Sequence, residues 1–421
     1  MLEIIPSTDV DATVQLPGSK YIANRLIPMC ALASTASKLT NVVDNDDIQA
    51  AIGGLNALGY QLKLDKGCLD IQPRKEALSE AVSLNTAHSG TFSRFVAAVA
   101  ALESVEVTVN CSEKMATRPM KELFRALSSL GVSIQSNNQK LPAVITGPVT
   151  KKNCELDAGR SSQFLSALLI VAPLTEHGLD IRLIGNQVSN SYVDMTCHWM
   201  SLMGIDLQQK DKHLIIESGQ SYQGISVNVP GDAVSASYFM GLVAVAKGSI
   251  RIESFDHNSL QGESKFYQVL EKMGMRFEKG EDYIVAISDS QLKGIEIDMG
   301  EMPDVVQTLA VIASFAKGTT KITNIAHLAY KESNRISDTA TELIKAGVKV
   351  EFGEDYLIIE GGEPRSATIE TYDDHRMAMS MALLGAKTEG IRIKDPLVVN
   401  KSFPNYWKLM AQCGLNSKIL S

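Results

Sequence analysis

A glycine at the end of an amphipathic helix recurs six times along this chain. The six are Gly59, Gly131, Gly204, Gly274, Gly347 and Gly414, and subtracting neighbouring residue numbers gives spacings of 72, 73, 70, 73 and 67. Glycine can end a helix in the left-handed conformation at low steric cost, and an apolar residue after it can start a strand. Six copies at nearly constant spacing indicate a duplicated α/β unit that is too long for a solenoid repeat.

The repeat predicts two domains of three units each. A chain of 421 residues is long enough for two or three domains. The turn Val229–Asp232 follows the third unit and is the best boundary. Because the first strand precedes the first full unit, we expect it to pair with the C-terminal half. One domain would then consist of residues 1–18 and 230–421 and the other of residues 19–229, with a ligand site in the cleft between them.

Three helices can be placed from the pattern before any motif is considered. Tyr21–Ala33 reads as a helix, and a second helix has Asp46 or Asp47 near its N-cap. Gly90–Leu102 is apolar on nearly all sides, which predicts a buried helix.

Composition and charge argue against several classes of protein. The chain has 40 Lys and Arg against 48 Asp and Glu, a net charge of -8, whereas nucleic-acid binding favours a basic surface. The first residues resemble no signal peptide, and apolar stretches such as Phe95–Leu102 are too short to cross a bilayer. The six cysteines form no CxxC pair, so we expect reduced thiols. These features predict a cytoplasmic protein without nucleic-acid or membrane partners.

Cationic side chains gather where predicted loops lead into helices. A helix N-terminus presents free N–H groups and a positive dipole end, and Lys or Arg beside it adds contacts for phosphate or carboxylate. Such a set predicts a small ligand with several negative charges. The junctions are Pro17-Gly18-Ser19-Lys20 with Arg25, Ser89-Gly90-Thr91 with Arg94, Arg118 with Pro119 in the first helical turn, Gly159-Arg160-Ser161-Ser162-Gln163, Lys331-Glu332-Ser333-Asn334-Arg335, Asp373-Asp374-His375-Arg376 and Lys401-Ser402-Phe403-Pro404.

Each junction taken alone also has an ordinary structural interpretation, as a helix cap or a solvated helix face. No P-loop or nucleophile elbow is present in the sequence. His88, His327 and His375 are dispersed, so we infer no metal and no other cofactor. Carboxylates are available for proton transfer at Asp304, Glu332 and Asp374. The residues alone therefore predict a two-domain enzyme acting on small anions.

Nine ordered motifs cover nearly the whole chain. They are LPGSK..ANR, SGT..R, TRP, SSQFL.ALL, GDA.SASYF, MPD, KES.RI, DDHRMAM and K.FP.Y. In this order the chain resembles the 5-enolpyruvylshikimate-3-phosphate synthases, a family of enolpyruvyl transferases. The resemblance implies two domains of three βαβαββ copies each, arranged as an inside-out α/β barrel, which agrees with the six glycines. It also implies closure around phosphoenolpyruvate and shikimate 3-phosphate, and a monomer.

The resemblance further implies a role for each matching residue. Phosphoenolpyruvate would be bound by Lys20, Gly90, Arg118, Gln163, Arg335, Arg376 and Lys401. Shikimate 3-phosphate would be bound by Lys20, Tyr21, Arg25, Ser161, Ser162, Gln163, Ser189, Tyr192, Asp304, His327 and Lys331. Thr91, Arg94, Asp374 and His375 would support these groups. Asp304 would be the general base for the 5-hydroxyl, Glu332 would protonate the methylene carbon, and Lys20 would assist.

Several positions depart from the family pattern. Tyr21 stands where the family usually has Ser beside the acceptor carboxylate, and His327 stands where many members have Asn. This chain also has His88 and Ser89 where the family favours Asn and Ala. Phe95 stands where the family usually has Pro, and Asn334 stands where it has Asp. These changes leave open a paralogue that uses another cyclic hydroxy acid.

Two further alternatives fit less well. A sister enzyme acting on UDP-N-acetylglucosamine would need a cysteine-bearing loop, whose pattern is missing from CSEKMATRP. A catalytically dead binding module need not have kept Asp304, Glu332 and Lys401.

Overall fold

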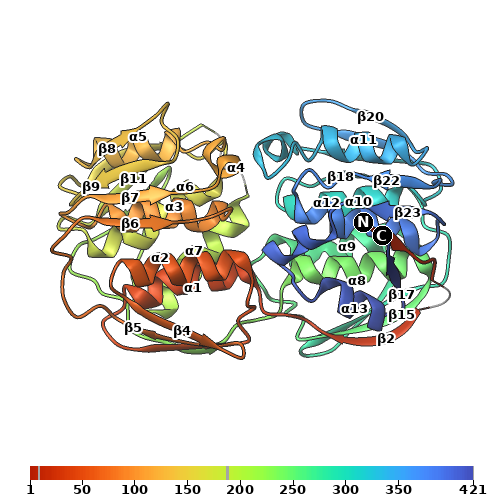
Figure 1. Ribbon diagram of the computed structural model, residues 1–421, viewed down its shortest axis with the longest axis horizontal. Coiled ribbons are helices and arrows are strands. Elements are labelled where there is room, and N and C mark those ends of the chain that lie inside the picture. The colour runs from red at the N-terminus through yellow and green to blue at the C-terminus, as the bar shows by residue number, and fades with distance from the viewer. Residues whose placement is uncertain (8–9, 186–188, 421) are drawn as a thin grey trace. The chain divides into compact units, whose positions relative to one another are not determined.

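The chain folds as a mixed α/β protein, and its described residues form six four-stranded sheets. The computed structural model describes residues 1–7, 10–185 and 189–420 (Figure 1). Two compact units are present: Met1–Pro17 with Pro230–Ser421, and Gly18–Val229. The expected boundary differs from this division only at Gly18. No helix in the described part of the chain is long and apolar enough to cross a membrane.

The unit of residues 18–229 has seven described α-helices around three of the sheets. The helices are α1 (Lys20–Ala31), α2 (Asp46–Ala57), α3 (Gly90–Ala100), α4 (Glu113–Ala116), α5 (Lys121–Ser129), α6 (Ser162–Val171) and α7 (Asn190–Leu202), with the 3-10 helix η1 (Ala172–Leu174). The strands are β3 (Ser37–Thr40), β4 (Gln61–Asp65), β5 (Cys68–Gln72), β6 (Val82–Asn85), β7 (Val107–Asn110), β8 (Ser133–Ser136), β9 (Ala143–Thr146), β10 (Asn153–Asp157), β11 (Leu179–Ile184), β12 (Gln208–Lys210), β13 (His213–Ile216) and β14 (Ser226–Asn228).

The unit formed by residues 1–17 and 230–421 contains the other three sheets. Its α-helices are α8 (Ala233–Ala246), α9 (Phe266–Met273), α10 (Val306–Ala313), α11 (Ser337–Lys345), α12 (His375–Ala382) and α13 (Tyr406–Gln412). Its 3-10 helices are η2 (Gly262–Lys265), η3 (Pro303–Val305), η4 (Ala326–Tyr330), η5 (Leu383–Ala386) and η6 (Pro396–Lys401). Its strands are β1 (Leu2–Ile4), β2 (Val10–Gln15), β15 (Gly248–Glu253), β16 (Arg276–Lys279), β17 (Tyr283–Ser288), β18 (Glu296–Asp298), β19 (Thr319–Thr323), β20 (Lys349–Phe352), β21 (Leu357–Glu360), β22 (Ala367–Ile369), β23 (Ile391–Ile393) and β24 (Ser417–Ile419).

All six sheets share one pairing pattern, in which one pair of neighbouring strands is parallel and the other two pairs are antiparallel. In the sheet β10-β11-β13-β12, for example, β10 is parallel to β11, and the remaining pairs are antiparallel. The same pattern holds in β14-β3-β5-β4, β6-β7-β9-β8, β2-β15-β17-β16, β18-β19-β21-β20 and β22-β23-β1-β24.

The six repeated glycines have the conformation that the sequence predicts. Their φ angles lie between 78° (Gly347) and 114° (Gly274), a region that side chains other than glycine rarely adopt. Each glycine follows a helix and precedes the strand at one end of a sheet, namely β4, β8, β12, β16, β20 or β24.

The two N-terminal strands complete sheets of the C-terminal half, which confirms the expected pairing of the first strand. Strand β1 is antiparallel to both β23 and β24, with Leu2 opposite Ile393 and Ile419. Strand β2 is parallel to β15 over its whole length. Residues distant in sequence therefore share one core in this unit.

Apolar helices form the centre of each unit. In the C-terminal unit α8 packs against α10, and α10 against α12, and these helices lie between the strands β18 and β22 and the strands β15 and β17 (Figure 1). In the other unit α3 packs against α6 and α1. Helix α3 is buried at every position except Thr91, as predicted, although it ends at Ala100.

Of two local predictions at helix starts, one is confirmed and one is wrong. The N-cap of α2 is Asn45, whose Oδ1 accepts from the Ile48 amide at 2.9 Å, and Asp46 and Asp47 follow it in the first turn, near the N-cap as predicted. Pro119 precedes the N-cap Met120 of α5 and lies outside the first helical turn. The local sequence contained several residues able to cap α2, and only the backbone geometry selects Asn45. Asp47 is thereby available for another partner.

Candidate active site

In the C-terminal unit, Asp304 is held by two buried arginines. Its Oδ1 accepts from Nη1 of Arg335 at 2.8 Å, and its Oδ2 accepts from Nη2 of Arg376 at 3.2 Å. Lys331 Nζ lies 3.9 Å from Oδ1. The backbone N–H of Asp304 donates to Glu263 at 3.3 Å, so both its main chain and its side chain are fixed. The 3-10 helix η3 places this carboxylate just before the buried helix α10.

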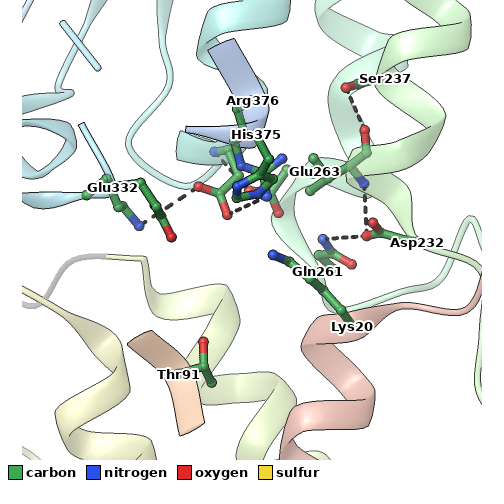
Figure 2. A network of polar contacts seen from close by, with 12 residues as sticks. Lys20, Thr91, Asp232, Ser237, Gln261, Glu263, Glu332, His375 and Arg376 are labelled. Atoms are coloured by element: carbon green, nitrogen blue, oxygen red, sulfur yellow. Dashed lines mark hydrogen bonds and ion pairs between the residues drawn. The ribbon is translucent and has the colours of Figure 1, made fainter. Parts of the chain in front are cut away.

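Glu332 links a second pair of cations in the same unit. Its Oε1 accepts from Lys401 Nζ at 2.9 Å, and its Oε2 accepts from Arg335 Nη2 at 2.8 Å. Glu332, His375 and Arg376 lie in one cluster (Figure 2). Because Lys401 comes from the end of η6, almost seventy residues further along the chain, this contact depends on the tertiary fold.

Asp374 is fully buried and organises the remaining contacts. It caps α12 by accepting from the Arg376 amide at 2.9 Å, and it accepts from Arg335 Nε at 2.7 Å and Ser333 Oγ at 3.0 Å. His375 Nδ1 lies 3.7 Å from its Oδ1. One guanidinium, that of Arg335, therefore contacts all three carboxylates that the sequence proposed for proton transfer.

Burial and neighbouring charges shape the electrostatics of this cluster. Burial lowers the pKa of Arg335, but the carboxylates of Asp374, Glu332 and Asp304 outweigh it and raise that pKa overall. Burial also raises the pKa of Tyr238, whose hydroxyl accepts from Arg376, to about 12. Burial and then Lys331 lower the pKa of His327 to about 4, so its imidazole is neutral near pH 7. Its Nε2 has no hydrogen-bond partner in residues 1–7, 10–185 and 189–420.

In the unit of residues 18–229, Lys20 opens helix α1 after the N-cap Ser19. Its Nζ lies 3.3 Å from Oδ2 of Asp47, and both side chains are largely buried. Lys20 also lies over the ring of Tyr21, at 5.5 Å from the ring centre. The Tyr21 ring in turn packs against Tyr192, with 5.3 Å between ring centres.

Arg25 is a buried cation without a carboxylate partner among the described residues. Its Nε donates to Thr196 Oγ1 at 2.8 Å, and its Nη1 donates to the carbonyl oxygen of Tyr21 at 2.9 Å. Its Cζ lies 5.5 Å from the ring centre of Tyr192 and 5.8 Å from that of Phe95. Burial lowers its pKa to about 10, although Tyr192 and Tyr21 act in the opposite direction. A buried cation that is paired only with neutral groups is well suited to an anionic ligand.

Gly90 lies at the start of α3 and in the middle of a second cationic group. A Cβ atom at this position would lie 2.1 Å from Nη1 of Arg118 and 3.0 Å from Nη1 of Arg94. Arg94 donates to Gln163 Oε1 at 2.7 Å, and Gln163 Nε2 donates to Thr91 Oγ1 at 3.0 Å. Gly90 is therefore required for the close approach of the arginines, and not for a special φ angle.

The predicted serines lie at helix starts. Ser161 caps α6, with its Oγ accepting from the Gln163 amide at 3.3 Å, and Ser162 is the first residue of that helix. Ser189 precedes α7 with φ 54° and makes no side-chain cap. Their hydroxyls and the N–H groups of the first turns are the kinds of donor that bind phosphate.

The structure thus gathers the sequence-predicted residues of the C-terminal unit into one cluster and those of the other unit into two groups, one around Arg25 and one around Gly90. Lys331, Arg335, Arg376 and Lys401 meet Asp304, Glu332 and Asp374 in the C-terminal unit. Asp47, Thr196 and Glu263 were not predicted as site residues. Asp47 was placed only near a helix N-cap, and no motif marked the other two. No group of His, Cys, Asp and Glu that could hold a metal ion occurs in the described part of the chain, and all six cysteines are free.

Comparison with known proteins assigns the family. Residues 4–410 match the family model of EPSP synthase (3-phosphoshikimate 1-carboxyvinyltransferase). The chain belongs to this family. Its relatives include the 3-phosphoshikimate 1-carboxyvinyltransferases of Photobacterium profundum, which is 37% identical with 98% of both chains covered, and of Vibrio atlanticus, which is 38% identical with 98% of this chain and 99% of the relative covered.

Solved structures agree with the family assignment. The 2.37 Å structure of EPSP synthase from Acinetobacter baumannii is similar with a TM-score of 0.82 and 25% identity, covering 100% of this chain and 99% of that one. This likeness extends over the whole EPSP synthase fold, including both compact units.

Proposed function

We propose that this protein transfers the enolpyruvyl group of phosphoenolpyruvate to the 5-hydroxyl of shikimate 3-phosphate, with release of inorganic phosphate, as a monomer. The observation that carries the proposal is the Asp304 carboxylate, which two buried arginines hold beside Glu332 and Lys401. Family membership supports this assignment, because relatives matched over 98% of the chain carry the name of this enzyme. The product enters the biosynthesis of chorismate and aromatic amino acids.

Two domains would provide the active site in this proposal, one formed by residues 1–18 and 230–421 and the other by residues 19–229. Each would contain three copies of a βαβαββ unit, in the inside-out α/β barrel of enolpyruvyl transferases. The common pairing pattern of the six sheets supports the duplication. Each unit would supply cations for the ligands.

The donor would be bound through its two anionic groups. Lys20, Arg118, Gln163 and the N-terminus of α3 at Gly90 would hold the phosphate of phosphoenolpyruvate. Arg335, Arg376 and Lys401 would bind its carboxylate. Because Arg335 and Lys401 both contact Glu332 in the described structure, the incoming carboxylate would compete with Glu332 for them. That competition would release Glu332 to carry a proton.

The acceptor would be bound through its carboxylate, its phosphate and its ring. Arg25 would pair with the carboxylate, which would supply the anionic partner that this buried cation lacks. Ser161, Ser162, Ser189 and Lys331 would bind the 3-phosphate. Tyr192 and Gln163 would line the ring, while His327 and Tyr21 would border the site.

The chemical step would be an addition followed by an elimination. Asp304 would take the proton of the 5-hydroxyl while the 5-hydroxyl oxygen attacks C2 of phosphoenolpyruvate. Glu332 would donate a proton to C3. The resulting tetrahedral ketal would lose inorganic phosphate and a C3 proton, which restores the double bond. The surrounding Lys and Arg side chains would stabilise the negative charge of both ligands and of the leaving phosphate.

Phosphate release tests the proposal directly. Purified protein should release inorganic phosphate from phosphoenolpyruvate only when shikimate 3-phosphate is present, and an Asp304→Asn variant should lose most of this activity. Unphosphorylated shikimate and other cyclic alcohols serve as competing acceptors. Faster turnover with one of them would support a paralogue that uses another acceptor, as the replacement of the usual Ser by Tyr21 suggests. No phosphate release with any acceptor would contradict the proposal.

A further inference from the structure

Two consecutive residues with left-handed backbone conformation lead into Asp374. Tyr372 and Asp373 both have φ 53°, a conformation that residues other than glycine adopt rarely. The next residue, Asp374, caps α12 and holds Arg335. A turn that is unfavourable by itself persists only where surrounding contacts fix it.

Glu342 supplies those contacts. Its side chain is fully buried on α11, with Oε1 accepting from the Tyr372 hydroxyl at 2.6 Å and Oε2 accepting from the Glu370 amide at 3.1 Å. Lys345 Nζ donates to Oε1 at 2.7 Å. Burial, together with the hydrogen bond to Glu342, raises the pKa of Tyr372, so its hydroxyl remains a donor at neutral pH.

Helix α11 connects these contacts of Glu342 to Arg335 in the active site. This helix begins at Ser337, two residues after Arg335. Glu342 therefore ties the helix that follows Arg335 to the turn that precedes Asp374, the two residues joined at 2.7 Å. A second contact between the same segments joins Thr339 Oγ1 to Met377 Sδ at 3.7 Å.

We infer that Glu342 and Tyr372 are positioning residues for the binding of the donor carboxylate. Together they hold Asp374 at the place where it orients Arg335 and caps the helix start that carries Arg376. The hydrogen bonds described for these two residues join them to each other, to Lys345 and to the Glu370 amide, so we place their effect at Asp374. Their effect on phosphoenolpyruvate binding rests on the proposed function. Their stabilisation of the turn at Tyr372 and Asp373 does not.

Tyr372→Phe is the sharpest test, because it removes one hydroxyl and keeps the aromatic ring. The matched control is Tyr356→Phe, which removes an exposed hydrogen bond of 3.1 Å to Glu351 in the same unit. Tyr372→Phe should raise KM for phosphoenolpyruvate about tenfold, as expected for a small misplacement of binding groups. A purely structural role would reduce the amount of folded enzyme and lower apparent kcat at unchanged KM. The control should match the wild type.

Glu342→Gln provides a second, independent variant. Glutamine replaces one of the two carboxylate oxygens with an NH2 group, so the donor bound to that oxygen, the Tyr372 hydroxyl or the Glu370 amide, loses its acceptor. KM for phosphoenolpyruvate should therefore rise as well. Combined with Tyr372→Phe it should add little, because either change breaks the same link. Unchanged KM in both single variants of an active enzyme would overturn the inference.

Hydrogen exchange tests the turn without any reaction. Backbone amides in residues 370–376 should exchange faster in Tyr372→Phe than in the wild type and in Tyr356→Phe. Unaltered exchange there would overturn the positioning role even if the protein had another substrate. Faster exchange together with an inactive wild type would instead count against the proposed function alone.

Discussion

Arg335 Nη1 donates a 2.8 Å hydrogen bond to Oδ1 of Asp304, and both side chains are buried. The same guanidinium contacts Glu332 and Asp374, so the carboxylates proposed for proton transfer share one cation. Proton transfer at one carboxylate therefore changes the electrostatic environment of the others. Substitutions in this cluster should be made with isosteric amides, which leave the arginine hydrogen-bonded.

Asp304→Asn should lower kcat about a hundredfold, the size expected when a general base is lost. The amide oxygen can still accept from Arg335 or Arg376, so KM for phosphoenolpyruvate should change much less. Steady-state rates of phosphate release measure both quantities. Asp289→Asn, at an exposed ion pair with Arg276 in the same unit, is the matched control. A kcat within about threefold of the wild type would exclude Asp304 as the base.

Gly90→Ala should weaken phosphoenolpyruvate binding and leave the fold intact. The new methyl group would lie 2.1 Å from the end of the Arg118 side chain, which can move aside at the expense of the phosphate site. We expect KM for phosphoenolpyruvate to rise about tenfold, as for other small displacements of binding groups. Gly53→Ala in α2 has nothing within 4 Å and is the control. An unchanged KM would show that Arg118 does not contact the donor.

Substitutions of Arg25 and of Tyr21 should differ in their effect on KM for the acceptor. Arg25→Gln should raise KM for shikimate 3-phosphate tenfold or more, roughly the loss of one charged hydrogen bond. Tyr21→Phe should be nearly silent, because Arg25 binds the main-chain carbonyl of Tyr21, which the substitution keeps. Initial rates at varied acceptor concentration distinguish the two. If Tyr21→Phe is as severe as Arg25→Gln, the hydroxyl itself binds the acceptor.

A large gain in turnover from Tyr21→Ser would have a different meaning. It would show that the tyrosine obstructs shikimate 3-phosphate. The natural acceptor would then be another cyclic hydroxy acid.

His327 should make the protein less stable in mild acid. Its pKa falls from 6.5 to about 4 on folding, so the unfolded chain binds a proton that the folded chain excludes. The contribution of neutral His327 to the free energy of unfolding is therefore fully present above pH 6.5 and is lost as the pH falls towards 4. This group should lower the free energy of unfolding by about 2 kcal/mol between pH 7 and pH 5.

Urea unfolding of His327→Asn at both pH values measures this contribution. The variant should lose less stability than the wild type on acidification, whereas His177→Asn, at an exposed position, should follow the wild type. Equal losses in all three proteins would contradict the burial of a neutral His327.

Local sequence determined much of this protein. The six glycines mark left-handed helix ends because no other residue adopts positive φ as readily, and their spacing reveals the repeat. The apolar run from Gly90 predicted a buried helix, and the ordered motifs predicted the family. The motif residues Asp304, Glu332 and Arg335 were all named from the sequence.

Only the tertiary structure decided which of these residues touch. Asn45 rather than Asp47 caps α2, and Asp47 pairs instead with Lys20. Arg335 meets three carboxylates, and Glu342 on helix α11 reaches Tyr372 in the turn before α12. Periodicity and capping preferences act over a few residues. The longer of these contacts join residues 27 to 39 positions apart, and the local ones are each one option among several. Their geometry is set by how the helices pack, which no local pattern encodes.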